Sequence, residues 1–317
     1  MKFGFSIPTR GPISDRASVI TIARHGEALG FDCITVNDHI VVPRETASTY
    51  PYSRSGSWAG GRYGEALEQL TMLAFLAGVT ERVRLLTAVM VVPYRNPVTT
   101  ARMLATADHL SEGRLTVGCG VGWMKEEFEA LGTPPFEERG RVTDEYIRIF
   151  KEIWTSEAPE YDGAYNSFSG ISALPHPVQS PHPPLWIGGE SGPALRRAVQ
   201  LGDGWFPIGN NPRHPLNTLE KYRAGCERLH GFAEQAGRDP AALDLAYGAN
   251  WPYGGEARKT EDGERLILTG SDPTIVEDVA NLAALGVGHV IVSLQAGTLP
   301  ATLDLMQRFA SEIAAKS

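Results

Sequence analysis

The chain has 317 residues, of which 42% are hydrophobic and 21% charged, so it can bury a sizeable core and belongs to neither the disordered nor the fibrous class. Its net charge is −8 and it contains no run of lysine or arginine, which removes the attraction that nucleic acids and anionic membranes need. Small molecules are therefore the expected partners.

Short β-rich runs alternate with longer amphipathic segments along the whole chain, a pattern typical of parallel strands joined by helical crossovers. Eight runs are predicted to be strands: residues 3–7, 32–36, 83–89, 114–118, 185–188, 204–207, 243–247 and 289–292. Eight segments are predicted to be helices: residues 16–29, 65–79, 97–110, 142–154, 193–201, 216–236, 272–285 and 300–315.

A glycine recurs where four predicted helices turn back to a strand, in the stretches ALGFD, SEGRL, QLGDGW and ALGVGH. Glycine takes the left-handed conformation that ends a helix without steric cost, so the four stretches are predicted to be equivalent joints. Their repetition favours a closed (β/α)8 TIM barrel over an open doubly wound sheet. No linker composition divides residues 1–317, so one domain is expected, with insertions at 40–64 after strand two and 158–184 before strand five.

The stretch RLTVGCGVGWMKEEF, residues 114–128, has some likeness to the phosphate turn of a dinucleotide-binding fold. That fingerprint, G-x-G-x-x-G, needs its third glycine one position later than Gly122, where Trp123 stands instead. A dinucleotide site is therefore set aside. Two explanations of the glycines stay open: a tight turn without function, or a backbone without Cβ atoms that lets a flat ligand approach the catalytic face of the barrel.

Asn37, Asp38 and His39 form a polar cluster just beyond strand two. Imidazole titrates near neutral pH, so His39 is able to give or take a proton, and Asp38 is placed to tune it or to bind the polar edge of a ring. The alternative is a capping cluster that satisfies backbone groups of the loop.

Small residues end strands three and five. Residues 87–89 offer a place for a planar ring, although barrel core would show the same residue types. The stretch GGESGP, residues 188–193, starts a helix whose free N–H groups and positive dipole end would bind an anion such as phosphate. Pro193 removes one donor and Glu190 adds a negative charge, so a plain helix cap by Ser191 is the alternative.

The first insertion, RETASTYPYSRSGSWAGGRYGE, is rich in aromatic residues and arginine. Over the catalytic face of an acidic protein, such a loop is expected to be a lid that stacks on an apolar ligand or pairs with an anionic one. A subunit contact is the alternative. The charged stretch GGEARKTEDG, residues 254–263, is a second lid candidate.

Several other kinds of chemistry have no support. No G-x-S-x-G elbow, H-E-x-x-H pair, Walker lysine loop or Cys/His metal spacing occurs, so no metal is expected, and glycoside hydrolysis stays open but unsupported. Cys33, Cys119 and Cys226 are far apart, and the start MKFGFSIPTR lacks the apolar region of a signal peptide. A cytoplasmic protein with reduced thiols is expected, with no stretch of the about 20 apolar residues that cross a bilayer.

Five stretches together make the chain similar to a known family: FGFSIP, GFDCITVNDHI, LLTAVMVVPYRNPVTTARMLATADHLSEGRLTVGCGVGWMKEEFEALG, ERGRVTDEYIRIF and PPLWIGGESGPALRRAVQLGDGW. They resemble the bacterial luciferase-like flavin and deazaflavin oxidoreductases over nearly the whole chain. The combination of DHIVVP, YPYS and GVGWMKEEFEALG most resembles the branch that uses coenzyme F420, an 8-hydroxy-5-deazaflavin.

The resemblance implies a homodimer of barrels, each holding a tricyclic ring at the carboxyl ends of its strands. A bulge in strand three, often with a non-proline cis peptide, would support the ring. The residues implied to contact the cofactor are Asp38, Thr87, Ala88, Val89, Gly118, Cys119, Gly120, Gly122 and Trp123, together with Gly188, Gly189, Ser191 and Gly192 at its phosphate end. Sugar-phosphate dehydrogenases of the family carry a catalytic glutamate where Val121 stands, so that substrate is not expected.

The reaction that the resemblance implies is hydride transfer between reduced coenzyme F420 and a small organic substrate. His39 is the predicted catalytic residue, which supplies or removes one proton. An alternative is a two-component monooxygenase that uses reduced FMN and oxygen, and a further one is a non-catalytic flavin-binding protein. Substrate choice is assigned to the insertions at 40–64 and 158–184.

Overall fold

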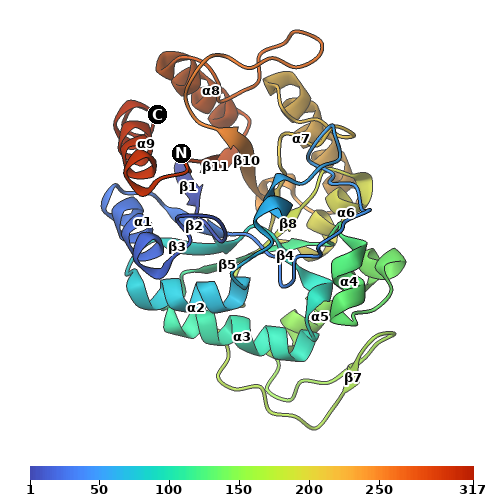
Figure 1. Cartoon of the computed structure of the whole chain (residues 1–317). Coiled ribbons are helices and arrows are strands. Elements are labelled where there is room, and N and C mark those ends of the chain that lie inside the picture. Colours follow the sequence, from blue (N-terminus) through green and yellow to red (C-terminus); the bar gives the residue numbers. More distant parts are fainter.

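Parallel strands form a closed barrel at the centre of the molecule (Figure 1). The computed structural model describes all 317 residues. The barrel strands are β1 (Lys2–Ser6), β2 (Cys33–Val36), β3 (Arg84–Thr87), β4 (Met90–Val91), β5 (Leu115–Gly120), β8 (Leu185–Gly188), β9 (Gly204–Phe206), β10 (Asp244–Pro252) and β11 (Val287–Ser293). Their order is β3-β2-β1-β11-β10-β9-β8-β5-β4. Because β3 and β4 both pair with β5, they fill one barrel position together and close the sheet. The predicted (β/α)8 TIM barrel is confirmed, and the open sheet is excluded.

Nine α-helices surround the barrel: α1 (Arg16–Ala28), α2 (Gln69–Val79), α3 (Pro97–Leu110), α4 (Lys125–Leu131), α5 (Arg139–Thr155), α6 (Gly192–Leu201), α7 (Leu219–Gln235), α8 (Asp272–Ala284) and α9 (Leu299–Glu312). Eight of them correspond to predicted helices. The ninth, α4, has seven residues and is too short for its apolar spacing to be recognised. None of the helices combines the length and the apolar character required to span a membrane.

Capping residues explain where two helices begin later than predicted. Glu68 accepts hydrogen bonds from the N–H groups of Leu70 and Thr71, at 3.1 and 2.7 Å, so α2 begins at Gln69 rather than at residue 65. Thr218 accepts the N–H of Lys221 at 3.3 Å, so α7 begins at Leu219 rather than at residue 216. In both cases the side-chain oxygen satisfies a donor that the first helical turn leaves unpaired.

Three of the four predicted glycine joints are left-handed. Gly30, Gly113 and Gly286 have φ angles of 84°, 80° and 88°. The prediction is wrong for Gly202, which has an extended backbone with φ −94°. Glycine is needed there for space instead, because a Cβ would lie 2.7 Å from a side-chain carbon of Ile187.

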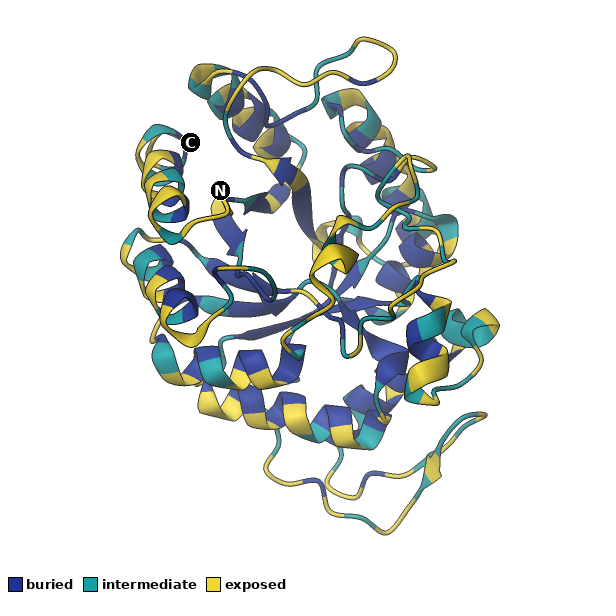
Figure 2. Ribbon diagram, viewed as in Figure 1, coloured by how far each residue is buried: buried dark blue, intermediate teal, exposed yellow.

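Two hydrophobic layers hold the fold together (Figure 2). The larger lies between the outer face of the barrel and the helices. The smaller fills the barrel interior with Cys33, Leu86, Trp186, Phe206, Ala246 and Ile291. Ala88, Val89 and Ile208 are only partly buried and pack on this inner cluster, so they form the floor of the barrel mouth at the carboxyl ends of the strands.

The two insertions lie in different places (Figure 1). The first, drawn in blue, crosses in front of the barrel mouth. The second forms the hairpin β6 (Tyr161–Asp162) and β7 (Ser167–Phe168) on the outside of the helix layer. There Glu145 of α5 accepts three backbone hydrogen bonds from residues 164–166, and Arg102 of α3 donates to the carbonyl of Pro175 at 2.8 Å. The assignment of substrate choice to residues 158–184 is therefore corrected.

The second lid candidate, residues 254–263, lies at the rim of the molecule, between β10 and α8. It meets the first insertion through an ion pair between Arg54 and Glu261. Both side chains of this pair are largely exposed, so the pair stabilises the contact by little.

Candidate active site

The predicted third strand is interrupted at the barrel mouth. β3 ends at Thr87 and β4 begins at Met90, and the peptide bond between Ala88 and Val89 is cis. This is the bulge that the family resemblance implied. Ala88 is tied to β2 because its N–H donates to the carbonyl of Val36 at 2.8 Å. Ala88 and Val89 are half-buried, and the part of their surface that stays exposed forms a small apolar ledge in the mouth, called the ledge below.

Three glycines on the neighbouring strands make room for the ledge. A Cβ on Gly118 would collide with the carbonyl oxygen of Thr87. A Cβ on Gly120 would collide with one methyl group of Val89, and a Cβ on Gly188 would lie 2.9 Å from the other. The glycines therefore receive the bulge rather than the ligand itself. The interpretation that their bare backbone admits a ligand directly is corrected, since the ledge stands between them and the mouth.

The other two residues of this stretch also differ from the prediction. The Cys119 side chain is fully buried in the layer that faces the helices, and burial raises the pKa of its thiol to about 12. Its side chain therefore cannot contact a ligand in the mouth. Gly122 has φ 82°, and a Cβ there would lie 2.7 Å from both Val91 and Phe128, so it serves the turn out of β5.

His39 is joined to a buried carboxylate on α4. Glu127 Oε2 accepts hydrogen bonds from His39 Nδ1 and from the Tyr94 hydroxyl, both at 2.8 Å. Glu127 Oε1 accepts the N–H groups of Ile40 and Val41, at 2.7 and 3.1 Å. Burial raises the pKa of Glu127, but the bond from His39 and the other donors outweigh it, so the pKa lies below its ordinary value. The carboxylate stays charged at neutral pH.

This carboxylate fixes which nitrogen of His39 carries a hydrogen. An ionised Glu127 can only accept, so Nδ1 of His39 donates to it. The ring of His39 makes its one hydrogen bond within the chain through Nδ1, so Nε2 is left free. It can therefore accept a proton when the ring is neutral and give one when the ring is charged.

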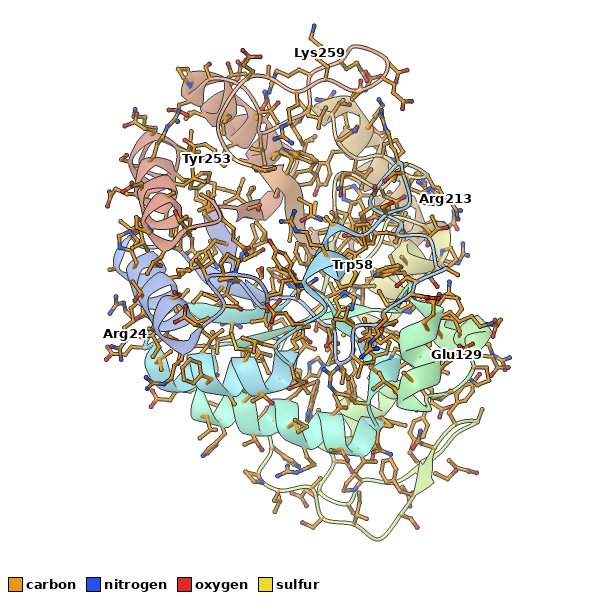
Figure 3. All side chains as sticks on the ribbon, in the orientation of Figure 1. Arg24, Trp58, Glu129, Arg213, Tyr253 and Lys259 are labelled. Carbon is orange, nitrogen blue, oxygen red and sulfur yellow. The ribbon has the colours of Figure 1, made fainter.

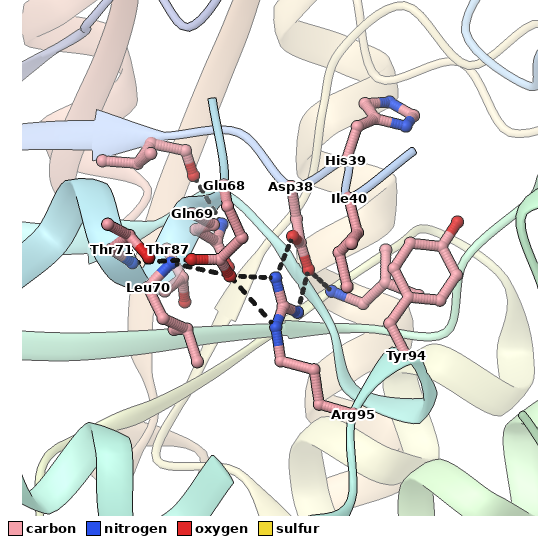
Figure 4. A network of polar contacts seen from close by, with 12 residues as sticks. Asp38, His39, Ile40, Glu68, Gln69, Leu70, Thr71, Thr87, Tyr94 and Arg95 are labelled. Atoms are coloured by element: carbon pink, nitrogen blue, oxygen red, sulfur yellow. Dashed lines mark hydrogen bonds and ion pairs between the residues drawn. The ribbon is translucent and has the colours of Figure 1, made fainter. Parts of the chain in front are cut away.

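Asp38 has a different role from the predicted one (Figure 4). Its carboxylate accepts hydrogen bonds from both terminal nitrogens of Arg95, at 2.7 and 2.8 Å, and from the N–H of Val91 at 2.8 Å. Arg95 also binds Glu68 at 2.6 Å. The Asp38 side chain is fully buried in this network, while the His39 ring points away from it. Asp38 therefore ties β2 to β4 and α2, and it neither tunes His39 nor reaches the mouth.

The first insertion closes over His39 with aromatic side chains. The Trp58 ring lies 4.2 Å from the His39 ring, centre to centre, with 32° between the planes, and it stands in front of the barrel in Figure 3. Trp123 meets Trp58 edge to face at 5.9 Å and Tyr50 at 5.0 Å. The loop is held by Glu126 of α4, which accepts the N–H groups of residues 47 and 48. Its aromatic residues Tyr50 and Trp58 therefore form, with Trp123, an aromatic cluster over His39.

The glycines after β8 lie at a helix start, as predicted. Gly189 has φ 102°, and its carbonyl accepts the indole N–H of Trp205 at 2.9 Å. Ser191 caps α6 by accepting the N–H of Ala194 at 3.4 Å, which agrees with the simpler of the two interpretations. This end of the mouth suits an anion for three reasons: the N–H of Gly192 stays unpaired, the positive end of the helix dipole lies here, and the guanidinium of Arg196 is near Gly192.

Glu190 does not oppose an anion there as strongly as its sequence position suggests. It is buried and accepts the N–H of Ile208 at 2.9 Å and the side-chain amide of Asn211 at 2.7 Å. Burial raises its pKa to about 7, so a large part of the carboxyl is neutral at neutral pH. Its contacts lie on the loop after β9, away from the start of α6.

Two residues of the site escaped sequence reasoning. Glu127 lies 88 positions from His39 on a helix that was not predicted, and Arg95 lies 57 positions from Asp38. The motif GWMKEEF contains Glu127 but shows two adjacent glutamates, and nothing in the pattern tells which one faces inward.

The comparison with known proteins agrees with this geometry. The profile of the luciferase-like monooxygenase family matches residues 1–251. The chain belongs to this family. An uncharacterized protein of Mycobacterium tuberculosis (strain ATCC 25618 / H37Rv) is 35% identical over 209 residues, covering 65% of this chain and 73% of that protein. The FMNH2-dependent dimethylsulfone monooxygenase of Pseudomonas putida is 36% identical over 203 residues, covering 63% of this chain and 52% of that enzyme.

Solved structures share the fold over nearly the full length. A monooxygenase from Streptomyces bottropensis superposes with a TM-score of 0.76 at 20% identity, covering 99% of both chains. The coenzyme F420-dependent tetrahydromethanopterin reductase from Methanopyrus kandleri gives 0.75 at 16%, covering 99% of this chain and 98% of that one. At such identities the likeness concerns the fold alone. Membership of the family makes the chain an enzyme of the luciferase-like oxidoreductase and monooxygenase type.

Proposed function

We propose that the chain is an oxidoreductase that transfers a hydride between reduced coenzyme F420 and a small organic substrate. The observation that carries the proposal is the His39–Glu127 pair beside the ledge, because it joins a proton carrier to an apolar support for a flat ring. The F420-dependent reductase of Methanopyrus kandleri and an F420-dependent secondary alcohol dehydrogenase, which share the fold, give further support.

The residues fit a flavin-type ring with an anionic tail. The ledge is apolar and half-exposed, and the aromatic lid above it suits a planar group. The ledge occupies the position next to β5, and β8 follows β5 in the barrel, so the start of α6 lies within the same part of the mouth. In this proposal Ala88 and Val89 support the ring, Trp123 borders it, and Ser191 and Gly192 hold the phosphate.

A reduced deazaflavin supplies the hydride when it is bound. The chain then has to orient the acceptor, exclude water and move one proton. Protonated His39 gives the proton on Nε2 to the substrate atom that gains electrons, and Glu127 keeps Nδ1 protonated throughout. Oxidation of the substrate uses the same groups in the opposite direction, with neutral His39 as the base.

A second function is favoured by one sequence relative. The 36% identical enzyme of Pseudomonas putida is an FMNH2-dependent monooxygenase, so reduced FMN with oxygen is the alternative cofactor system. The same ledge and helix start suit both cofactors, because both carry a flat tricyclic ring and a phosphate. The expected homodimer also stays a prediction, which sedimentation velocity would test.

The two functions separate when purified protein is mixed with each cofactor. We expect coenzyme F420 to bind more tightly than FMN, and reduced F420 to be oxidised by a carbonyl or unsaturated acceptor without oxygen. Absorbance and fluorescence follow both steps. Tighter binding of reduced FMN with oxygen-dependent turnover would establish the alternative, and binding without turnover across the acceptor panel would indicate a non-catalytic protein.

His39→Ala tests the proton step. We expect turnover to fall by about a hundredfold or more while the cofactor Kd changes by less than about threefold, because general acid-base catalysis contributes at least that factor. His109→Ala, at an exposed position on α3, is the control and should leave both quantities unchanged. Equal losses of turnover and of cofactor binding, or no loss of either, would refute the role of His39.

A further inference from the structure

Arg10 stands at the barrel mouth without a charged partner. It lies in the loop that follows β1, and its guanidinium makes no ion pair and no hydrogen bond with another residue. It packs over the Trp58 ring at 4.8 Å from the ring centre, on the same aromatic side chain that stacks with His39. Glu127 and Tyr50 are the acids that act on it through space, and neither contacts it.

Three other arginines near the mouth have polar partners. Arg95 binds Asp38 and Glu68, Arg54 binds Glu261, and Arg139 donates to backbone carbonyls, one of them that of Gly122. Arg10 is more buried than an unpaired cation should be, since burial outweighs its distant acids and lowers its pKa. Burying a guanidinium without an anionic partner costs free energy. The presence of Arg10 at this half-buried position therefore needs an explanation.

The lid backbone is shaped around this guanidinium. A Cβ on Gly60 would come too close to a terminal nitrogen of Arg10 and to the Trp58 ring, so the glycine lets the loop pack closely against both side chains. The neighbouring backbone is also fixed, because Gly11 donates to Glu65 at 2.8 Å and the N–H of Leu67 donates to the carbonyl of Thr9 at 2.8 Å. Arg10 is therefore held in place by both sides of the mouth rather than left loose at the surface.

The barrel order separates Arg10 from the phosphate end of the proposed cofactor site. Around the barrel, β1 and β8 are four positions apart, which places them on opposite sides. The helix start after β8 serves an anionic tail there, while Arg10 stands beyond β1, next to the β2 loop that carries His39. An anion on Arg10 therefore belongs to the substrate side of the mouth.

We propose that Arg10 binds a carboxylate of the substrate, whose flat apolar body lies beside His39 under the aromatic lid. The inference rests on the proposed function, because it names the substrate class of the same site. A single guanidinium presents two parallel donors that match a carboxylate. A phosphate is not favoured, since no helix N-terminus and no second cation supplements Arg10 in the contacts around it.

The test compares carboxylates with their neutral amides. Acetate, benzoate, 2-naphthoate and indole-3-acetate, each paired with its amide, are titrated calorimetrically into the full chain, with and without oxidised F420 or FMN. We expect at least one carboxylate to bind tenfold or more tightly than its amide. Arg10→Met should reduce this preference to twofold or less, and Arg10→Lys should keep part of it because the charge remains while the fork is lost.

Arg62→Met is the matched control. Arg62 lies in the first insertion, two residues from Gly60, and stacks on Tyr63 at 4.7 Å, but it is exposed, so its loss should leave the preference unchanged. A preference that survives Arg10→Met, or carboxylates that nowhere exceed their amides by threefold, would overturn the proposal. A tenfold rise in the cofactor Kd of the Arg10→Met variant would also overturn it, because Arg10 would then bind an anionic group of the cofactor and not of the substrate. Calorimetry measures carboxylate binding directly and does not depend on turnover. Failure of the proposed redox function would therefore be seen in the cofactor assays and not in this experiment.

Discussion

Two buried carboxyl groups follow neighbouring strands at the barrel mouth and differ in charge. Glu127, after β5, accepts four hydrogen bonds and has a lowered pKa. Glu190, after β8, accepts two hydrogen bonds from its surroundings, and burial raises its pKa to about 7. At Glu127 the donors, His39 foremost, outweigh burial, whereas at Glu190 burial outweighs the two donors.

Under the proposed function, this difference gives the two carboxyl groups different roles. The anion of Glu127 accepts the hydrogen of His39 Nδ1 and fixes the tautomer of the ring, as the proposed proton transfer requires. A carboxyl that is partly neutral at neutral pH holds the loop after β9, and it repels an anionic tail at the start of α6 less than a fully charged one would. The predictions below change Glu127 and Glu190 one at a time.

The largest effect on stability is expected for Glu127→Ala. The change leaves four donors without their acceptor, two of them on buried side chains, so the free energy of unfolding should fall by about 3–5 kcal/mol, measured by denaturant or thermal unfolding. Tyr94→Phe removes one of the four donors and should cost only about 1 kcal/mol. Equal effects of the two substitutions would contradict the central position of Glu127.

Glu190→Gln should produce a smaller, pH-dependent change. The folded protein binds a proton on Glu190 up to about pH 7, whereas the unfolded chain releases it near its ordinary pKa of 4.5. The wild type should therefore lose stability as the pH rises from about 4.5 through about 7, by up to about 3 kcal/mol. Gln cannot ionise, so the variant should match the wild type at pH 5 and be more stable at pH 8. Thermal unfolding across this range measures it, and identical pH slopes would contradict the assignment.

The barrel was predictable because strand and helix periods are local properties of the sequence. His39 was found by its polar neighbours, and Thr87–Val89 and Gly188–Gly192 by their small side chains and the family resemblance. Contacts between distant segments were not accessible in this way. The partner of His39 lies 88 positions away, and the reason for the glycines at 118 and 120 lies on the adjacent strand.

The same limit explains the misplaced roles. Asp38 looked like a partner for its neighbour His39, but in a loop after a strand adjacent side chains point in different directions, and its carboxylate meets Arg95 instead. Cys119 alternates with the inward-facing Gly118 and Gly120 along β5, so its side chain faces the helices.

A crystal structure of the chain with bound oxidised cofactor, F420 or FMN, tests the central claim most directly. The account predicts that the ring lies against Ala88 and Val89, with Nε2 of His39 facing the substrate side of the ring and the phosphate at the start of α6. A ring bound elsewhere, or one that leaves His39 on the far side of a closed lid, would contradict it.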